Sequence, residues 1–204
     1  FGQAVRFAVR MGKRANGQAV RLAMPGGACS AGRYRLRPFR VESEALAKED
    51  PMNIAVYCGS SPQATPCYIE AATALGRWIG SNGHRLVYGG SAIGLMGAVS
   101  RATLDAGGEV VGVEPGFFIE AGVAQHDLTE LIVVDTMAER KAKMIELADV
   151  FVALPGGVGT LEEISEVMSL MRLGMEPGPC YLLNLNGFYE GLRTLIGAMV
   201  DAAF

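Results

Sequence analysis

The sequence predicts an α/β fold, with a Rossmann-like doubly wound parallel sheet in a single domain that follows an N-terminal extension. From residue 52 onward, short apolar runs alternate with longer stretches in which apolar residues recur at helical spacing. The short runs are apolar on both faces, which is typical of strands in a buried parallel sheet. Glycine is abundant, 27 of 204 residues, and much of it stands between these runs, where turns and ligand loops need it.

The first half of the alternating region contains three expected strands and two helices. The strands are Asn53–Cys58, Arg85–Tyr88 and Glu109–Val113. Between the first two, a helix begins near Pro66, because proline suits the first turn of a helix, and it ends at Gly83. The next helix runs from about Gly94 to Ala106 and stops at a pair of glycines.

The second half repeats this order. The expected strands are Leu131–Val134, Asp149–Leu154 and Tyr181–Leu185. The expected helices run from Met137 to about Ala148, from the glycines after Pro155 to about Leu173, and from Phe188 to Ala203. Right-handed crossovers bring the carboxyl ends of parallel strands to one edge of the sheet, so we expect a ligand there.

Charge divides the chain into residues 1–51 and 52–204. The first part holds ten Lys or Arg against four Asp or Glu, a balance of +6, and the second holds eight against seventeen, a balance of −9. We interpret residues 1–51 as a basic extension, disordered or spurious, because their many glycines discourage long helices. A transit-like segment and a nucleic-acid arm are the alternatives, but the arm would lack interleaved aromatic residues. We therefore expect no nucleic-acid partner.

Composition excludes several other classes of protein. No apolar run reaches about 18 residues, so we expect no membrane-spanning helix and no membrane partner. Four cysteines without CxxC spacing favour reduced thiols in a cytoplasmic protein. The two histidines, His84 and His126, lie far apart and outside any HExxH pattern, which argues against a zinc site. We expect neither a metal nor a cofactor.

Two glycine loops each leave an expected strand and enter an expected helix, at Gly89–Gly97 and at Pro155–Glu163. Backbone amides at the positive end of a helix bind phosphate well, and glycine removes the Cβ that would hold an anion away. Neither loop is a Walker A motif, and neither matches GxGxxG. The loops therefore indicate a mononucleotide phosphate, although either could be an ordinary tight turn.

Charged residues near these loops are the candidates for chemistry. Glu163 lies one helical turn after Thr160 and should point toward the same strand-end crevice. Arg140 and Lys141 lie near the start of the helix that begins at Met137, where positive charge opposes the helix dipole. An unfavourable charge at such a place suggests a functional role, whereas a solvated helix face is the simpler explanation.

The segment Pro155–Glu163 has the pattern PGGxGTxxE, which resembles the signature of the Lonely Guy (LOG) family of cytokinin riboside 5′-monophosphate phosphoribohydrolases. Val87–Gly97 is similar to the YGG…GLMG loop of that family, and Met137–Lys143 is similar to its MxxRK segment. Val56–Pro62 resembles its CGSSP opening. The resemblance runs from about residue 52 to residue 204.

The resemblance implies hydrolysis of the N-glycosidic bond of adenine-type nucleoside 5′-monophosphates, with no cofactor, in a homodimer. It places Arg140 and Glu163 on the catalytic pair. The implied substrate- and phosphate-binding residues are Gly89, Gly90, Ser91, Met137, Lys141, Pro155, Gly156, Gly157, Val158, Gly159, Thr160 and Leu161. Cleavage of the glycosidic bond develops oxocarbenium-like positive charge on the ribose, and a carboxylate such as Glu163 can stabilise that charge.

The sequence departs from the family pattern at Ala138, at Gly122, where Glu120 would have to substitute, and at 176–179. These departures concern base specificity more than the phosphate site. A carrier that binds a nucleotide or cofactor, similar to molybdenum-cofactor carrier proteins, is the alternative function on this fold. A lysine decarboxylase is rejected, because a pyridoxal enzyme needs a larger domain pair than about 150 residues supply.

Overall fold

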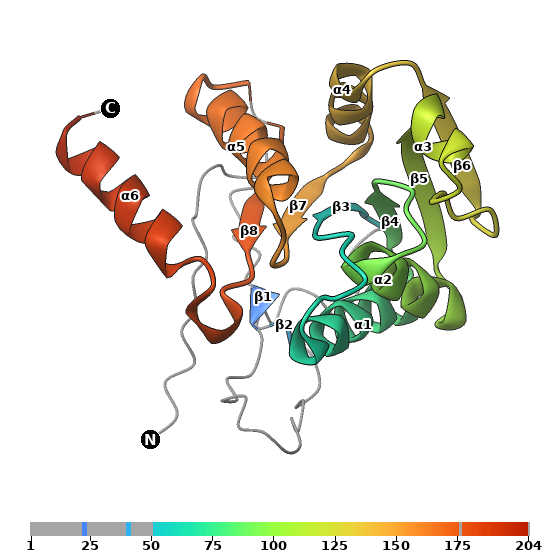
Figure 1. Ribbon diagram of the computed structural model, residues 1–204. Helices are drawn as coiled ribbons and strands as arrows, with labels where there is room; N and C mark the ends of the chain where they lie inside the picture. Colours follow the sequence, from blue (N-terminus) through green and yellow to red (C-terminus); the bar gives the residue numbers. More distant parts are fainter. Residues whose placement is uncertain (1–21, 24–39, 42–50, 176, 204) are drawn as a thin grey trace.

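The computed structural model describes residues 22–23, 40–41, 51–175 and 177–203 (Figure 1). A six-stranded sheet has the order β6-β5-β4-β3-β7-β8, and each neighbouring pair is parallel. Its strands are β3 Asn53–Tyr57, β4 Arg85–Tyr88, β5 Glu109–Pro115, β6 Glu130–Val134, β7 Val150–Ala153 and β8 Cys180–Leu182. The predicted fold class, an α/β doubly wound parallel sheet, is confirmed.

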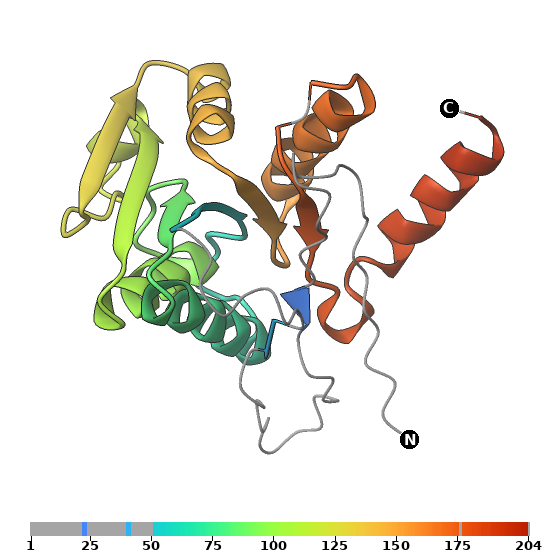
Figure 2. The same ribbon diagram turned by 180° about the vertical axis from the view of Figure 1, so that it is seen from behind.

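Helices cover both faces of the sheet (Figures 1 and 2). They are α1 Pro66–Ser81, α2 Gly94–Asp105, α3 Gly116–Glu120, α4 Met137–Leu147, α5 Val158–Arg172 and α6 Glu190–Asp201. One core layer joins α1 and α2 to the sheet, and a second layer joins α4 and α5 to its other face. Alternate residues of β3 enter the two layers, Val56 the first and Tyr57 the second. Burial on both faces explains why the strands are continuously apolar.

The helices α1 and α2 approach each other closely because α1 carries glycines at their contact. A Cβ on Gly80 would lie 2.5 Å from the backbone oxygen of Thr103 and 2.8 Å from the Cβ of Ala106. Both distances are shorter than ordinary van der Waals contact, so a larger residue would push the helices apart.

The order of the strands locates the ligand edge. From β3 the chain moves outward through β4, β5 and β6, and it then returns to the other side of β3 to form β7 and β8. The direction of winding reverses between β3 and β7. In doubly wound sheets a ligand binds outside the carboxyl ends of the strands at such a reversal. The loops that follow β3, β4 and β7 therefore define the region of interest.

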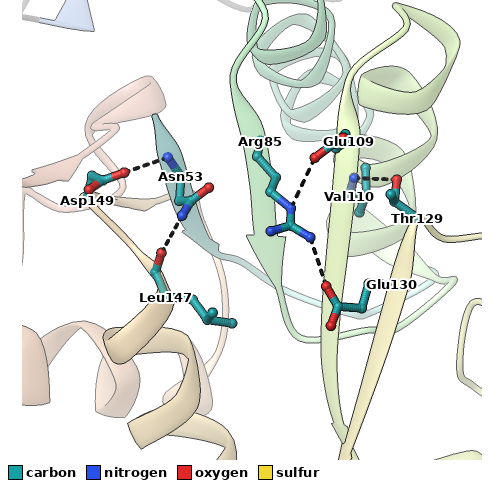
Figure 3. A network of polar contacts seen from close by, with 8 residues as sticks. All are labelled: Asn53, Arg85, Glu109, Val110, Thr129, Glu130, Leu147 and Asp149. Atoms are coloured by element: carbon teal, nitrogen blue, oxygen red, sulfur yellow. Dashed lines mark hydrogen bonds and ion pairs between the residues drawn. The ribbon is translucent and has the colours of Figure 1, made fainter. Parts of the chain in front are cut away.

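Polar contacts hold the opposite, amino-terminal edge of the sheet (Figure 3). The backbone N–H of Asn53 donates to Asp149 Oδ2 at 2.8 Å, and its side chain donates to the Leu147 carbonyl at 2.8 Å. Arg85 lies 3.5 Å from Glu109 and 2.8 Å from Glu130, so one guanidinium connects three neighbouring strands. These contacts lie at the end of the sheet remote from the glycine loops.

Several element boundaries differ from the sequence predictions. The last strand was predicted to reach Leu185, but β8 stops at Leu182, and a 3-10 turn follows at Leu185–Gly187. Asn186 has a positive φ of 51°, which neither a strand nor a helix continues through. The final helix starts at Glu190 instead of Phe188, because Tyr189 is its non-helical N-cap residue. Conversely, β5 extends two residues beyond the predicted Val113, which brings Glu114 into the sheet.

Within the first 51 residues the structure describes only Leu22–Ala23 and Arg40–Val41 as a short antiparallel pair, β1 and β2, together with Pro51. The predicted disorder of this segment otherwise lies outside the described residues. Among the described helices, none has the length and apolar character required to cross a membrane.

Candidate active site

The loop between β7 and α5 leaves the first turn of α5 accessible. Gly157, Val158 and Gly159 are exposed, with Val158 at 86%. A Cβ on Gly157 or Gly159 would meet no described atom within 4 Å apart from the immediate surroundings of each residue. The first turn of this 15-residue helix contains no acidic residue. The amides and the positive end of the helix dipole are therefore available to an anion.

The same loop is held in place by tight packing against the turn after β3. A Cβ on Gly156 would overlap the buried side chain of Thr160 and would lie 2.9 Å from the backbone nitrogen of Gly59. That nitrogen donates to the carbonyl of Pro155 at 3.2 Å. The turn after β3 and the turn after β7 thus support each other, which fixes the predicted phosphate loop against its neighbour.

Glu163 lies on α5 one turn after Thr160, as predicted, and it is buried, with 5% of its surface exposed. Burial raises the pKa of its carboxyl to about 7, and the nearby Arg140 opposes that rise. A carboxyl with a pKa near neutral pH can exist in either protonation state under physiological conditions. Such a group is suited to proton transfer and to stabilising positive charge on a substrate.

Arg140 lies in the first turn of α4 and is also only 5% exposed. Its Nη2 donates to the carbonyl of Gly89 at 3.1 Å, and its Nη1 lies 3.7 Å from the sulfur of Met137. Its buried Nε has no hydrogen-bond acceptor among the described residues. No described carboxylate forms an ion pair with it within 4 Å. A buried guanidinium without a direct ion-pair partner is costly, and an anionic ligand would offset that cost.

The glycines after β4 make room for protein side chains. A Cβ on Gly89 would overlap the guanidinium of Arg140, so no larger residue fits while Arg140 stays in place. Gly90 has a φ of +85°, and its Cβ would lie 2.6 Å from Glu114 Oε2. Ser91 is buried and forms an isolated antiparallel bridge with Ala124. Direct contact of Gly89, Gly90 and Ser91 with substrate stays a prediction.

Lys141 is directed toward α5 and not toward the phosphate loop. Its ammonium forms ion pairs with Glu162 and with Glu166, the second at 2.9 Å. These two carboxylates raise the pKa of Lys141. Glu162 is exposed but paired. A role for Lys141 in substrate contact stays a prediction, and it would require the ammonium to share or leave these partners.

The remaining predicted residues are more peripheral. Leu161 is exposed at the start of α5, and Met137 is half-buried beside Arg140. Among the departures from the family pattern, Ala138, Glu120 and Gly122 are all exposed. Residue 176 of the third departure lies outside the described residues.

Sequence reasoning missed two buried polar residues near this site. Glu114 ends β5 beside Gly90, with 1% of its surface exposed, and burial raises its pKa to about 7. Tyr57 ends β3. Burial raises the pKa of its hydroxyl, and the charge of Glu163 raises it further. A signal for Glu114 was available, because it is a carboxylate directly after an apolar strand. Tyr57 gave no such signal, since an aromatic residue is ordinary in a strand.

Within the described part of the chain, no group of three or more His, Cys, Asp or Glu side chains is arranged to hold a metal ion. The residues of the candidate site offer anion binding by amides and a guanidinium, combined with the Glu163 carboxyl, whose pKa is about 7.

The sequence of this chain is similar to a family model and to several known proteins. A family model described as "Possible lysine decarboxylase" matches residues 96–204. The cytokinin riboside 5′-monophosphate phosphoribohydrolase of Rhodococcoides fascians is 47% identical over 163 residues, which are 79% of this chain and 82% of that protein. The Arabidopsis thaliana enzyme LOG5, of the same name, is 44% identical over 159 residues, which are 78% of this chain and 70% of that protein.

Solved structures confirm the fold. A molybdenum cofactor carrier protein from Chlamydomonas reinhardtii aligns with a TM-score of 0.58 over 73% of this chain and 86% of its own, at 24% sequence identity. Identity this low indicates a shared fold and does not transfer function. The sequence relatives are much more similar, and the matching family model covers Arg140, the loop after β7 and Glu163. The chain therefore belongs to the Lonely Guy family of cytokinin riboside 5′-monophosphate phosphoribohydrolases.

Proposed function

We propose that this chain hydrolyses the N-glycosidic bond of adenine-type nucleoside 5′-monophosphates, including cytokinin ribotides, to release free base and ribose 5-phosphate. The observation that carries the proposal is the placement of buried Arg140 and buried Glu163 at the accessible amino end of α5. Relatives 40–47% identical are named for this activity.

Phosphate binding is assigned to the loop after β7. The amides of Gly156, Gly157, Val158 and Gly159 and the hydroxyl of Thr160 would hold the 5′-phosphate, with Pro155 and Leu161 at the two ends of the loop. The region 52–204 has a formal balance of −9. Because net charge of that sign repels an anionic substrate, its attraction has to be local and come from the helix end and Arg140.

Glu163 would act on the ribose. Breaking the C1′–N9 bond leaves positive charge on the ribose ring, and water then adds its hydroxyl to C1′ while a proton goes to the departing base. An ionised Glu163 can stabilise that positive charge and accept the proton of the attacking water. Its pKa of about 7 leaves a large ionised fraction at neutral pH.

Arg140 would act on negative charge. Its guanidinium is fixed by the Gly89 carbonyl, and its buried Nε has no acceptor among the described residues. A fixed cation stabilises either the electron pair that leaves with the base or the 5′-phosphate. No described carboxylate lies within ion-pair distance of Arg140, so in both roles the substrate would supply the negative charge that pairs with it.

The test is release of base from AMP and from isopentenyl-AMP by the purified protein, followed by chromatography. We expect adenine and ribose 5-phosphate in equal amounts. Adenosine is the matched control substrate, because it has the same glycosidic bond without the phosphate, and we expect it to react far more slowly. Binding of AMP without any turnover would instead support the carrier function.

A homodimer is proposed from the apolar surface of α6. None of the described residues of α6 is buried, and this helix stands apart from the sheet in both views (Figures 1 and 2). Leu195, Met199 and Val200 are all exposed on it. A second copy of the chain would cover this surface. Light scattering should give twice the mass of one chain, and Leu195→Asp should lower this to the mass of a single chain. An unchanged mass in Leu195→Asp would count against α6 as the interface.

We propose that residues 52–204 carry the activity and that residues 1–51 are dispensable. Deletion of 1–51 should leave kcat/KM unchanged, and a soluble but inactive truncation would contradict this. The cytoplasm is the proposed location, since the four cysteines lack disulfide-like spacing and Cys58 and Cys180 are buried thiols.

A further inference from the structure

Glu114 occupies an unusual position for a charged residue. It lies near the carboxyl end of β5, paired in register with Val133 of β6, and only 1% of its surface is exposed. Its Oε2 is buried without a hydrogen-bond donor among the described residues. A carboxyl placed in this way destabilises the fold, so it requires a reason other than packing.

The Gly89–Gly90 dipeptide lies between Glu114 and Arg140. The guanidinium of Arg140 fills the place of a Gly89 side chain and binds the Gly89 carbonyl at 3.1 Å. The carboxyl of Glu114 fills the place of a Gly90 side chain, 2.6 Å from that Cβ position. Both glycines are therefore needed for the two charged side chains to reach the same two residues of backbone.

Among the described residues, Arg140 is the cation whose charge acts on Glu114. From α4, the charge of Arg140 lowers the pKa of Glu114 and opposes the larger effect of burial, which together leave it at about 7. From β4, Tyr88 lies near enough for Glu114 to raise its pKa, and Asp127, before β6, acts on Tyr88 in the same direction. The part of α2 that meets Tyr88 contributes the uncharged Ser100. On α3, Glu120 is exposed.

We infer that Glu114 is a positioning residue of the hydrolytic reaction, whose carboxylate acts across the Gly89–Gly90 dipeptide to hold the Arg140 guanidinium at the substrate. This inference rests on the proposed function. Glu114 itself is not assigned a contact with the substrate. Its ionised form attracts the guanidinium from behind the glycines, and this attraction is strong because water is largely excluded there. Protonation of Glu114 removes this attraction and leaves the Gly89 carbonyl and the Met137 sulfur as the described hydrogen-bond acceptors of Arg140.

The test compares Glu114→Gln with Glu109→Gln, which makes the same substitution at the exposed amino end of the same strand. Rates with AMP at saturation are measured from pH 5.5 to 9, together with calorimetric binding of ribose 5-phosphate. For Glu114→Gln we expect kcat lower by about 10- to 100-fold, because a displaced reacting group costs that much. We expect the acid limb of log kcat to become shallower, since one of two required ionisations is lost. For Glu109→Gln, both the rate profile and the affinity for ribose 5-phosphate should be unchanged.

Several outcomes would overturn the inference. Glu114→Gln with the kcat and acid limb of the unsubstituted protein would do so, as would equal losses in both variants. If Glu114→Gln does not fold, Glu114→Asp decides the question, because it keeps a carboxylate but moves it away from Arg140; an unchanged kcat there would also contradict us. An unsubstituted protein without any turnover would refute the proposed function itself, which is a distinct result.

Discussion

The two ends of the sheet treat charge in opposite ways. At the amino-terminal edge, Arg85 pairs with Glu109 and Glu130, and all three side chains remain substantially accessible to water (Figure 3). At the carboxyl-terminal edge, Arg140 and Glu163 are each 5% exposed, and neither forms an ion pair with a described residue. A single strand, β5, shows both arrangements, because it begins at Glu109 and carries Glu114 near its end.

We interpret this difference as a separation of structural charge from functional charge. Exposed ion pairs contribute little to stability, because water solvates both charged groups when the pair is broken. Buried, unneutralised groups cost free energy and persist where a site uses them. We expect the carboxyl-terminal charges to carry activity at the expense of stability, and the amino-terminal charges to do neither.

The largest effect is expected from the proposed catalytic pair. Arg140→Ala and Glu163→Gln should each lower kcat for AMP by about 10²- to 10⁴-fold, because each removes charge stabilisation or proton transfer in the transition state. The measurement is base release by variants shown to be folded by circular dichroism. Arg85→Ala serves as the control for loss of a guanidinium and should retain the activity. Undiminished release by either site variant would remove that residue from the mechanism.

A second comparison uses two glycines of the site. Gly89→Ala should displace Arg140, since the new methyl group overlaps the guanidinium, and we expect kcat to fall at least about tenfold with a stability loss of about 1 to 3 kcal/mol. Gly159→Ala meets no described atom within 4 Å, so the fold should keep its stability. If the phosphate occupies that space, KM should rise instead while kcat changes little. Equal effects in the two variants would contradict the difference drawn between the loops.

The pH dependence of stability should reveal the cost of Glu163. Its folded-state pKa of about 7 exceeds the usual 4.5, so the folded protein binds a proton that the unfolded chain has released between these pH values. Stability is therefore lost as pH rises from about 4.5 through 7. Glu163→Gln removes this loss and should stabilise the protein at pH 8, relative to pH 5, by on the order of 2 to 3 kcal/mol. Thermal unfolding of both proteins at the two pH values measures it, and a pH-independent difference would refute it.

Much of this architecture follows from the sequence because its signals are local. Glycine punctuation and apolar periodicity located all six strands of the parallel sheet, and the nine-residue loop with Glu163 specified the region of the site. What could not be predicted depends on distant contacts. The contact of Arg140 with Gly89 joins residues 51 positions apart, and the pairing of Lys141 with Glu162 and Glu166 depends on how α4 packs beside α5. The end of β8 was also mispredicted, because a tight turn at Asn184, in which the Leu185 N–H donates to the Leu183 carbonyl, follows the strand.

The smallest effect is expected at the amino-terminal edge. Glu130→Gln removes one of the two ion pairs of Arg85, at a side chain that is 51% exposed. Because water solvates both partners and Glu109 still faces the guanidinium, the free energy of unfolding should fall by less than about 1 kcal/mol. The loss should shrink further in 1 M salt, which screens exposed pairs, whereas the pH-dependent cost of buried Glu163 should hardly respond to salt. Urea unfolding at low and high salt measures both. A loss larger than about 2 kcal/mol, or one insensitive to salt, would mean that this edge is held by its charges in the way that we attribute only to the opposite edge.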